Sequence, residues 1–245
     1  SADIHKYGYA AKGASTITYR NLDYLRYQMF VYEDWPGGVF ASSALLGTRP
    51  GGGYAAAWGV LQYFGKAGYR KLAADTLEAV NRLKTGIEAI PELEVIGSPQ
   101  GPLFSYRSTS ADVSIYAVGD QMDARGWQVN RNQSPEGLHA MVTAQHLQVV
   151  DQYLEDLEAS VNTVRANPEL AQQGGAATYG MIAHVPLRGM IRKKVLEMYS
   201  EQYRAGGAEL DLASGASATG GDGSGLFDRA VQRYVAWRSR RAANS

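Results

Sequence analysis

The chain has 245 residues, with 24 lysine and arginine residues against 24 aspartate and glutamate residues, so its formal net charge is zero. This balance gives no support for a nucleic-acid partner, because binding to phosphate backbones calls for a basic surplus. The chain contains no cysteine, which excludes a disulfide framework, a thiolate nucleophile and a cysteine-based metal site. No run of about eighteen apolar residues is present, so we expect no membrane-spanning helix in this chain.

The first part of the chain alternates short extended stretches with glycine-rich breaks. Residues 14–19 combine β-branched and aromatic side chains and predict a strand. The aromatic-rich stretch 21–34 is expected to be partly extended, and the sequence Trp-Pro-Gly-Gly at 35–38 breaks it. A glycine-rich loop at 47–53 precedes a helix of small residues, from about 54 to 64, that we expect to pack closely against another backbone.

The next part predicts a small α+β domain. After a turn at 65–68, apolar residues at helical spacing predict an amphipathic helix over 69–89, which Pro91 ends. The elements after it follow an order typical of an antiparallel sheet with helices on one face. We expect strands at 93–96, 103–107, 127–129 and 137–143, and helices at 113–124 and 146–166.

The N-terminal segment carries the strongest chemical signal. It reads Ser-Ala-Asp-Ile-His-Lys-Tyr-Gly-Tyr-Ala-Ala-Lys-Gly-Ala-Ser and places His5 beside Lys6, with Lys12 six residues later. A lysine that forms a Schiff base must be a neutral amine, and a crowded polar setting with a second cation favours that state. A frayed terminus is a poor place for a catalytic side chain. We therefore expect this chain to be the C-terminal part of a longer protein.

A second segment, Gly-Thr-Arg-Pro-Gly-Gly at 47–52, suits anion binding. A threonine hydroxyl and free backbone N–H groups at the start of a helix form a natural anion site. A plain turn with a surface arginine is the alternative, and it is the better interpretation of a glycine-rich loop considered alone.

Together these segments resemble the sphingosine-1-phosphate lyase family. Similar strings in that family also match Trp35-Pro-Gly-Gly and Tyr179-Gly-Met, so the resemblance covers about 1–204. Ala11 and Ala14 depart from it, since the family often has proline and serine there. The resemblance implies an α/β fold: pyridoxal-phosphate (PLP) fold type I, aspartate-aminotransferase-like.

The same resemblance implies a domain organisation. Residues 1–65 form the C-terminal part of the PLP-binding large domain. Residues 66–204 form a bridging helix and a small α+β C-terminal domain. For 205–245 we expect a Gly/Ser-rich linker followed by a C-terminal helix, and we assign no activity to them.

The resemblance also implies roles for individual residues. Lys6 forms the Schiff base with PLP, exchanges it for the substrate amine and then moves protons. His5 contacts the cofactor phosphate or orients the lysine. Lys12 is a second cation near the reaction centre and holds an anionic substrate group. Thr48 contacts the cofactor phosphate of the neighbouring subunit. Arg49 is a structural or substrate-side cation, and Tyr7 is part of a wall beside the substrate.

The implied reaction is a retro-aldol cleavage of a phosphorylated sphingoid base to a fatty aldehyde and phosphoethanolamine. Two alternatives stay open at this point: a PLP-dependent decarboxylase of glutamate or aromatic amino acids, and a non-catalytic dimerising fragment. We expect a homodimer with a shared active site and no metal. The expected location is the cytoplasm, or a membrane surface reached through a segment before Ser1.

Overall fold

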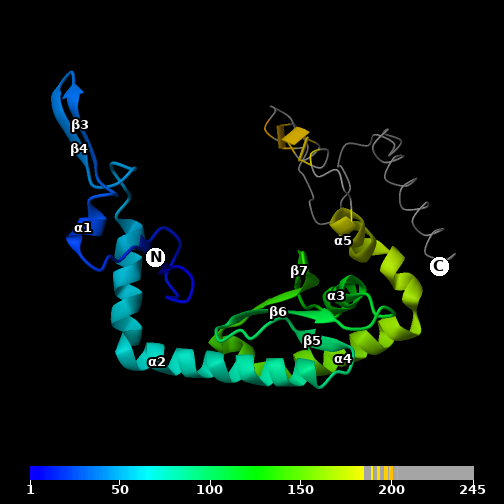
Figure 1. Cartoon of the computed structure of the whole chain (residues 1–245). Coiled ribbons are helices and arrows are strands. Elements are labelled where there is room, and N and C mark those ends of the chain that lie inside the picture. Colours follow the sequence, from blue (N-terminus) through cyan, green and yellow to red (C-terminus); the bar gives the residue numbers. More distant parts are fainter. Residues whose placement is uncertain (185–188, 190–191, 194–195, 198, 201–202, 204–245) are drawn as a thin grey trace. The chain divides into compact units, whose positions relative to one another are not determined.

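The computed structural model describes residues 1–184, 189, 192–193, 196–197, 199–200 and 203 (Figure 1). The linker and C-terminal helix expected at 205–245 lie outside the described residues. The chain divides into two compact units, Ser1–Asp75 and Thr76–Ser245. Each unit is described by itself below, as unit 1 and unit 2.

Unit 1 contains short strands, one short helix and the start of a long helix. Strand β1 pairs antiparallel with β2, and β3 pairs antiparallel with β4. The first pair covers less than the strand predicted at 14–19, since only two of those residues join the ladder. The elements are β1 (Ala2–Asp3), β2 (Ser15–Thr16), α1 (Leu22–Leu25), β3 (Phe30–Trp35), β4 (Gly38–Ser42) and α2 (Gly52–Glu88).

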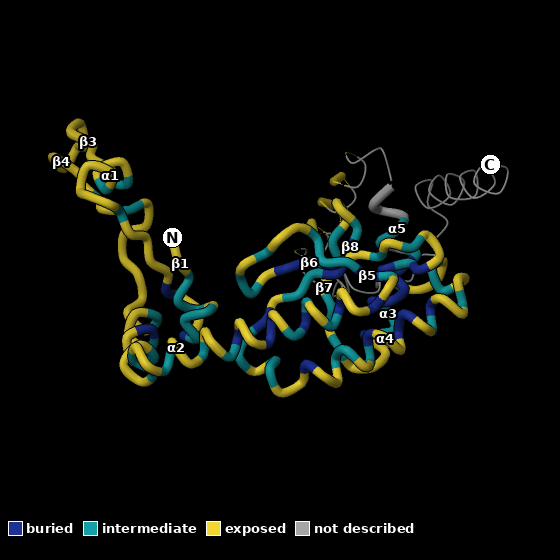
Figure 2. The backbone as a smooth tube through the Cα atoms, turned by 60° about the horizontal axis from the view of Figure 1, so that its bottom comes forward, coloured by how far each residue is buried: buried dark blue, intermediate teal, exposed yellow. Residues whose placement is uncertain are grey.

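The β3–β4 hairpin is exposed along almost its whole length. Every residue of β3 is exposed, and in β4 only Ser42 is half-buried, as the yellow tube over β3 and β4 in Figure 2 shows. The break predicted at 35–38 is the turn of this hairpin, where Gly38 adopts a φ of 109° that glycine accepts without strain. Aromatic contacts of Phe40 with Phe30 and Trp35 stiffen the ribbon.

Helix α2 consists of two helical stretches that meet at a kink at Gly65, inside the turn predicted at 65–68. Only Gly65 leaves the helical conformation, with φ 54° and ψ −173°. The predicted turn was too long, because the lysine and alanine that follow Gly65 are good helix formers and the helix resumes directly after Gly65. A single glycine therefore supplies the whole break.

Unit 2 holds a four-stranded antiparallel sheet with strand order β5-β6-β8-β7, as the small α+β domain predicted from the sequence requires. Phe104, Tyr106 and Leu138 are buried on one sheet face, against a core to which α2, α3 and α4 contribute (Figures 1 and 2). Its elements are β5 (Leu93–Val95), β6 (Leu103–Ser108), α3 (Ile115–Ala124), β7 (Asn130–Gln133), β8 (Glu136–Met141), the 3₁₀ helix η1 (Ala144–Gln148), α4 (Val150–Ala166), the 3₁₀ helix η2 (Pro168–Gln172) and α5 (Gly174–His184).

Two predicted elements of unit 2 were wrong. The strand expected at 127–129 does not form, because the N–H of Trp127 donates to the carbonyl of Met122 at 3.0 Å and ties this stretch to the end of α3. The pairing strand is β7, three residues later. The helix expected at 146–166 is divided, since Val149 has a ψ of 5° and separates η1 from α4.

Arg131 on β7 connects the sheet to two helices. Its guanidinium donates to Asp120 and Asp123 of α3, both at 2.6 Å, and its side chain is only 9% exposed. Burial opposes the charge of Arg131, but the hydrogen bonds and charges of the two carboxylates outweigh it and raise the pKa of the guanidinium. Asp120 also accepts from the N–H of Ala176 in α5 at 2.8 Å. One buried cation therefore organises the contact of β7, α3 and α5.

This arrangement predicts that Arg131→Met destabilises the protein by about 2 kcal/mol, because it leaves two carboxylates without their cation. Arg107→Met is the matched control, since Arg107 pairs with Glu94 on the surface and is 50% exposed. Its loss is expected to cost less than about 1 kcal/mol. Urea unfolding followed by circular dichroism measures both, and equal effects would contradict the role of Arg131.

Candidate active site around Lys6

Lys6 lies in a loop that is closed at its base by two strands. Ala2 pairs with Thr16 and Asp3 with Ser15, so this strand pair holds together the two ends of the loop formed by residues 4–14. Inside the loop, the N–H of Lys6 donates to the carbonyl of Asp3 at 3.1 Å, and the N–H of Tyr9 donates to the carbonyl of Lys6 at 2.9 Å. The backbone on both sides of the lysine is therefore fixed by hydrogen bonds.

The amine of Lys6 pairs with a carboxylate of its own loop. Its Nζ lies 2.8 Å from Oδ2 of Asp3, and the Lys6 side chain is 65% exposed. The hydrogen bond from Lys6 lowers the pKa of Asp3 below its usual 3.8, and the charges of Lys6 and His5 act in the same direction. The amine is thus accessible, and among the described residues Asp3 is its one ionic partner.

His5 is oriented by the far side of the loop. Its Nδ1 lies 3.1 Å from the carbonyl oxygen of Ala14. A carbonyl can only accept, so Nδ1 carries a hydrogen, and in the neutral ring Nε2 is the acceptor. The tautomer and the direction of the ring are fixed by this contact.

The loop docks on the start of α2 through a contact between two glycines. A Cβ added to Gly53 would lie 2.8 Å from the backbone carbon and oxygen of Gly13, so only glycine permits this approach. Ala10, Ala14 and Ala57 form a small buried cluster across the same contact. The two segments that the sequence analysis singled out, 1–15 and 47–53, therefore meet in the structure.

Two tyrosines hold the loop in ways that the sequence analysis missed. The hydroxyl of Tyr69 on α2 donates to the carbonyl of Gly8 at 2.7 Å. Tyr9 has a φ of 58°, which is uncommon for a residue with a side chain, and its ring packs edge-on against Phe64. Its hydroxyl is buried and has no hydrogen-bond partner among the described residues. A strained residue with an unsatisfied hydroxyl close to Lys6 is typical of a functional site.

The other predicted site residues lie near this loop in sequence or at the approach to α2. Lys12 is exposed and directly precedes Gly13, which touches α2. Thr48 and Arg49 are exposed and lie just before α2 begins at Gly52. Tyr7 is half-buried, and burial, with a smaller effect of Tyr9, raises the pKa of its hydroxyl.

The comparison with known proteins gives a consistent result, although no family model matches the chain. The chain is 38% identical to a sphingosine-1-phosphate lyase of Arabidopsis thaliana over 203 residues, and 39% identical to sphingosine-1-phosphate lyase 1 of Rattus norvegicus over 183 residues. These matches cover 83% and 74% of this chain. The chain is homologous to the sphingosine-1-phosphate lyases. It spans about a third of the length of these relatives, 37% and 32%.

A solved structure supports the same family. The sphingosine-1-phosphate lyase of Burkholderia pseudomallei K96243 superposes with a TM-score of 0.62 at 38% sequence identity. The match covers 67% of this chain and 37% of that chain. The predicted fold class, part of a fold type I PLP enzyme, is confirmed by this likeness.

Among the described residues, no group of three or more histidine, aspartate and glutamate side chains could hold a metal ion. None of the described helices combines the length and the apolar character needed to cross a membrane.

The contact between Gly13 and Gly53 predicts that Gly53→Ala separates the Lys6 loop from α2, because the new methyl group would overlap the backbone of Gly13. We expect a loss of about 1–3 kcal/mol and faster hydrogen exchange at the amides of Tyr9 and Ala10. Gly52→Ala is the control, since a Cβ there has open space around it. Slow exchange in both variants would show that the contact does not hold the loop.

The ion pair predicts a shift in the titration of Asp3. Lys6→Met removes the cation, so the pKa of Asp3 should rise toward 3.8. The pKa of Asp3 is lowered in the native protein. The ion pair is therefore present at pH values above this pKa and is lost as the pH falls through it. Carboxyl ¹³C chemical shifts measure this, and an unchanged titration in Lys6→Met would mean that the two side chains do not pair.

Proposed function

We propose that the protein to which this chain belongs is a PLP-dependent carbon–carbon lyase. It cleaves the Cα–Cβ bond of a phosphorylated sphingoid base and releases a fatty aldehyde and phosphoethanolamine. The observation that carries the proposal is the docking of the Lys6 loop on the glycine-rich start of α2. This contact brings an exposed amine and a helix N-terminus into one local structure, and the homology to sphingosine-1-phosphate lyases supports the same reading.

The residues present fit PLP. An aldehyde needs an accessible amine, and the Nζ of Lys6 has only Asp3 as its ionic partner among the described residues. A phosphate needs N–H donors and a hydroxyl, and the start of α2 and Thr48 would supply them to the cofactor of the neighbouring subunit. The buried hydroxyl of Tyr9, which lacks a partner in the described part of the chain, leaves one further polar group for a ligand. His5 is oriented for either a phosphate contact or a contact with the lysine.

When bound, PLP supplies an aldehyde for amines and a ring that delocalises the electron pair left by bond cleavage. The chain's own part is proton handling and orientation. Nζ of Lys6 can carry a proton next to the carboxylate of Asp3, 2.8 Å away, and can return it to a reacting atom. Nε2 of His5 is the nitrogen that is free of the Ala14 contact, so it can hold a proton toward the phosphate.

The substrate contacts are also proposals. Lys12 and Arg49 would bind the phosphate of the substrate, because a dianionic group favours cations with flexible stems. Tyr7 would form a wall beside the reacting carbon. We place the reaction in the cytoplasm, a compartment with which the absence of cysteine agrees. We also propose that a segment outside this chain attaches the protein to a membrane surface.

A homodimer with a shared site completes the proposal, with Thr48 contacting the phosphate bound to the neighbouring subunit. Unit 1 exposes an unusual amount of apolar surface, which in folded proteins marks an interface. The exposed side chains include Tyr27, Val31, Trp35, Val39, Leu45 and Trp58, each more than half exposed.

The test traps the amine in the full-length protein. After incubation with PLP and borohydride reduction, mass spectrometry of peptides should find the phosphopyridoxyl group on Lys6. Lys6→Ala should lose the adduct and the absorbance of the bound cofactor, because no other amine replaces it. Lys71→Ala is the control, since Lys71 is a surface residue paired with Asp75 and should leave the adduct in place. An adduct on another lysine would refute the assignment.

Product analysis distinguishes the reaction from its alternatives. With a sphingoid base phosphate we expect a fatty aldehyde and phosphoethanolamine, and with glutamate or tyrosine no carbon dioxide. Carbon dioxide release would favour the decarboxylase. PLP bound at Lys6 with neither product would favour a non-catalytic role.

A further inference from the structure

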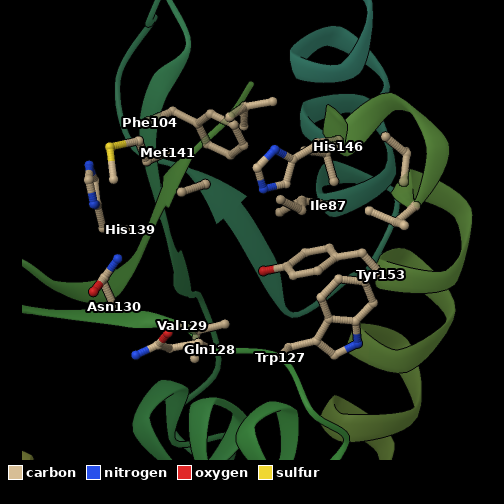
Figure 3. Close-up of a pocket in the computed structure, with 15 residues that line it drawn as sticks. Ile87, Phe104, Trp127, Gln128, Val129, Asn130, His139, Met141, His146 and Tyr153 are labelled. Atoms are coloured by element: carbon tan, nitrogen blue, oxygen red, sulfur yellow. The ribbon is translucent and has the colours of Figure 1, made fainter. Parts of the chain in front are cut away.

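Unit 2 contains a pocket that lies among β6, β8, η1 and α4 and belongs entirely to that unit. Its volume is about 220 Å³. Ile87, Phe104, Val142 and Val150 contribute apolar lining, while Gln128 and Asn130 add amides. Figure 3 shows Phe104, His146, Tyr153 and Trp127 around one common space.

The aromatic walls of the pocket are fixed by hydrogen bonds. The indole Nε1 of Trp127 donates to Asp156 at 2.8 Å, and this bond is the main reason why the pKa of Asp156 is lowered. Trp127 and Tyr153 meet edge to face, with ring centroids 5.1 Å apart. A pocket with such walls is preformed, so a planar apolar group can enter without reordering them.

The hydroxyl of Tyr153 is available as a donor inside the pocket. It lies 2.6 Å from the hydroxyl of Tyr106, and one of the two hydrogens occupies the space between the oxygens. Tyr106 is 1% exposed and is surrounded by the apolar core, where an unused O–H would be costly. Tyr106 is therefore the donor of this pair, and the hydrogen of Tyr153 is directed into the pocket, where Figure 3 shows its hydroxyl end.

His146 adds a second donor. Its Nδ1 lies 3.0 Å from the backbone nitrogen of Thr143, which can only donate. In the neutral imidazole Nδ1 is thus an acceptor and Nε2 carries the hydrogen. The contact completes a capping box at the start of η1, so the ring is held with Nε2 toward the lined space, as Figure 3 shows.

The pocket lacks the charged groups that an ionic ligand would need. Its lining residues, all within the described part of the chain, include no aspartate, glutamate, lysine or arginine. An ionised ligand would be buried there without a counter-charge, which is strongly unfavourable. The hydroxyl of Tyr153 and Nε2 of His146 instead match an uncharged acceptor, whose two lone pairs can accept both hydrogens. The amides of Gln128 and Asn130 and the imidazole of His139 are the other polar groups of the lining.

We propose that this pocket binds an uncharged carbonyl compound with a compact apolar body. The carbonyl oxygen accepts from the hydroxyl of Tyr153 and from Nε2 of His146. The apolar body packs between Phe104 and Trp127. This assigns a small-molecule site to unit 2.

Acetophenone is a suitable probe, because it joins a flat apolar ring to one carbonyl group. Saturation-transfer NMR on the full-length protein should give a Kd on the order of 1 mM for a ligand of this size. Ethylbenzene lacks the carbonyl and benzoate carries a charge, so both should bind at least about fivefold more weakly. Ethylbenzene binding as tightly as acetophenone, or no acetophenone binding at all, would overturn the proposal.

Two variants test the donors without emptying the pocket. Tyr153→Phe removes only the hydroxyl, and His146→Asn keeps an acceptor for the N–H of Thr143 while it removes Nε2. Each should weaken acetophenone about fivefold and leave ethylbenzene unchanged. Tyr63→Phe is the control, because Tyr63 is 83% exposed and does not line the pocket. Thermal unfolding confirms that each variant is folded, and unchanged affinity for acetophenone in both folded donor variants would overturn the proposal.

Discussion

The close approach of Gly13 and Gly53 is the contact on which the candidate site depends. The loop that carries Lys6 buries fully only Ala10 and Ala14, so apolar burial within the loop contributes little to its order. It is ordered because two backbones without side chains touch at the start of α2, and because Tyr69 binds the carbonyl of Gly8. The amine of Lys6, the imidazole of His5 and the strained Tyr9 all lie in the loop that this docking holds.

The two units differ in how they are stabilised. Unit 2 has a continuous core that joins one face of its sheet to α2, α3 and α4. Unit 1 has only a small alanine cluster, and its β3–β4 hairpin is almost wholly exposed. The candidate site residues lie in the unit with the smaller core.

Buried polar groups in unit 2 determine the positions of the side chains and backbone groups around them. Arg131 fixes the positions of Asp120 and Asp123, and through Asp120 it fixes the first turn of α5. The Tyr106–Tyr153 pair does the same at the pocket, because a core hydroxyl that must donate leaves its partner's hydrogen pointing into the cavity. In both places one largely buried group, Arg131 or Tyr106, fixes the position of more exposed neighbours.

The family and most of the secondary structure could be predicted from the sequence. The His5-Lys6 segment indicated the family and made Lys6 the candidate amine, and periodicity located β5, β6, β8 and α3. Local patterns failed where a distant or backbone contact decided the outcome: the stretch at 127–129 is tied to α3, and Gly65 alone breaks α2. Asp3 could have been found from its spacing to Lys6. Only the tertiary structure could bring Gly13 to Gly53, Tyr69 to Gly8 and Tyr153 to Tyr106, because these contacts join residues 40 or more positions apart and depend on how the helices pack.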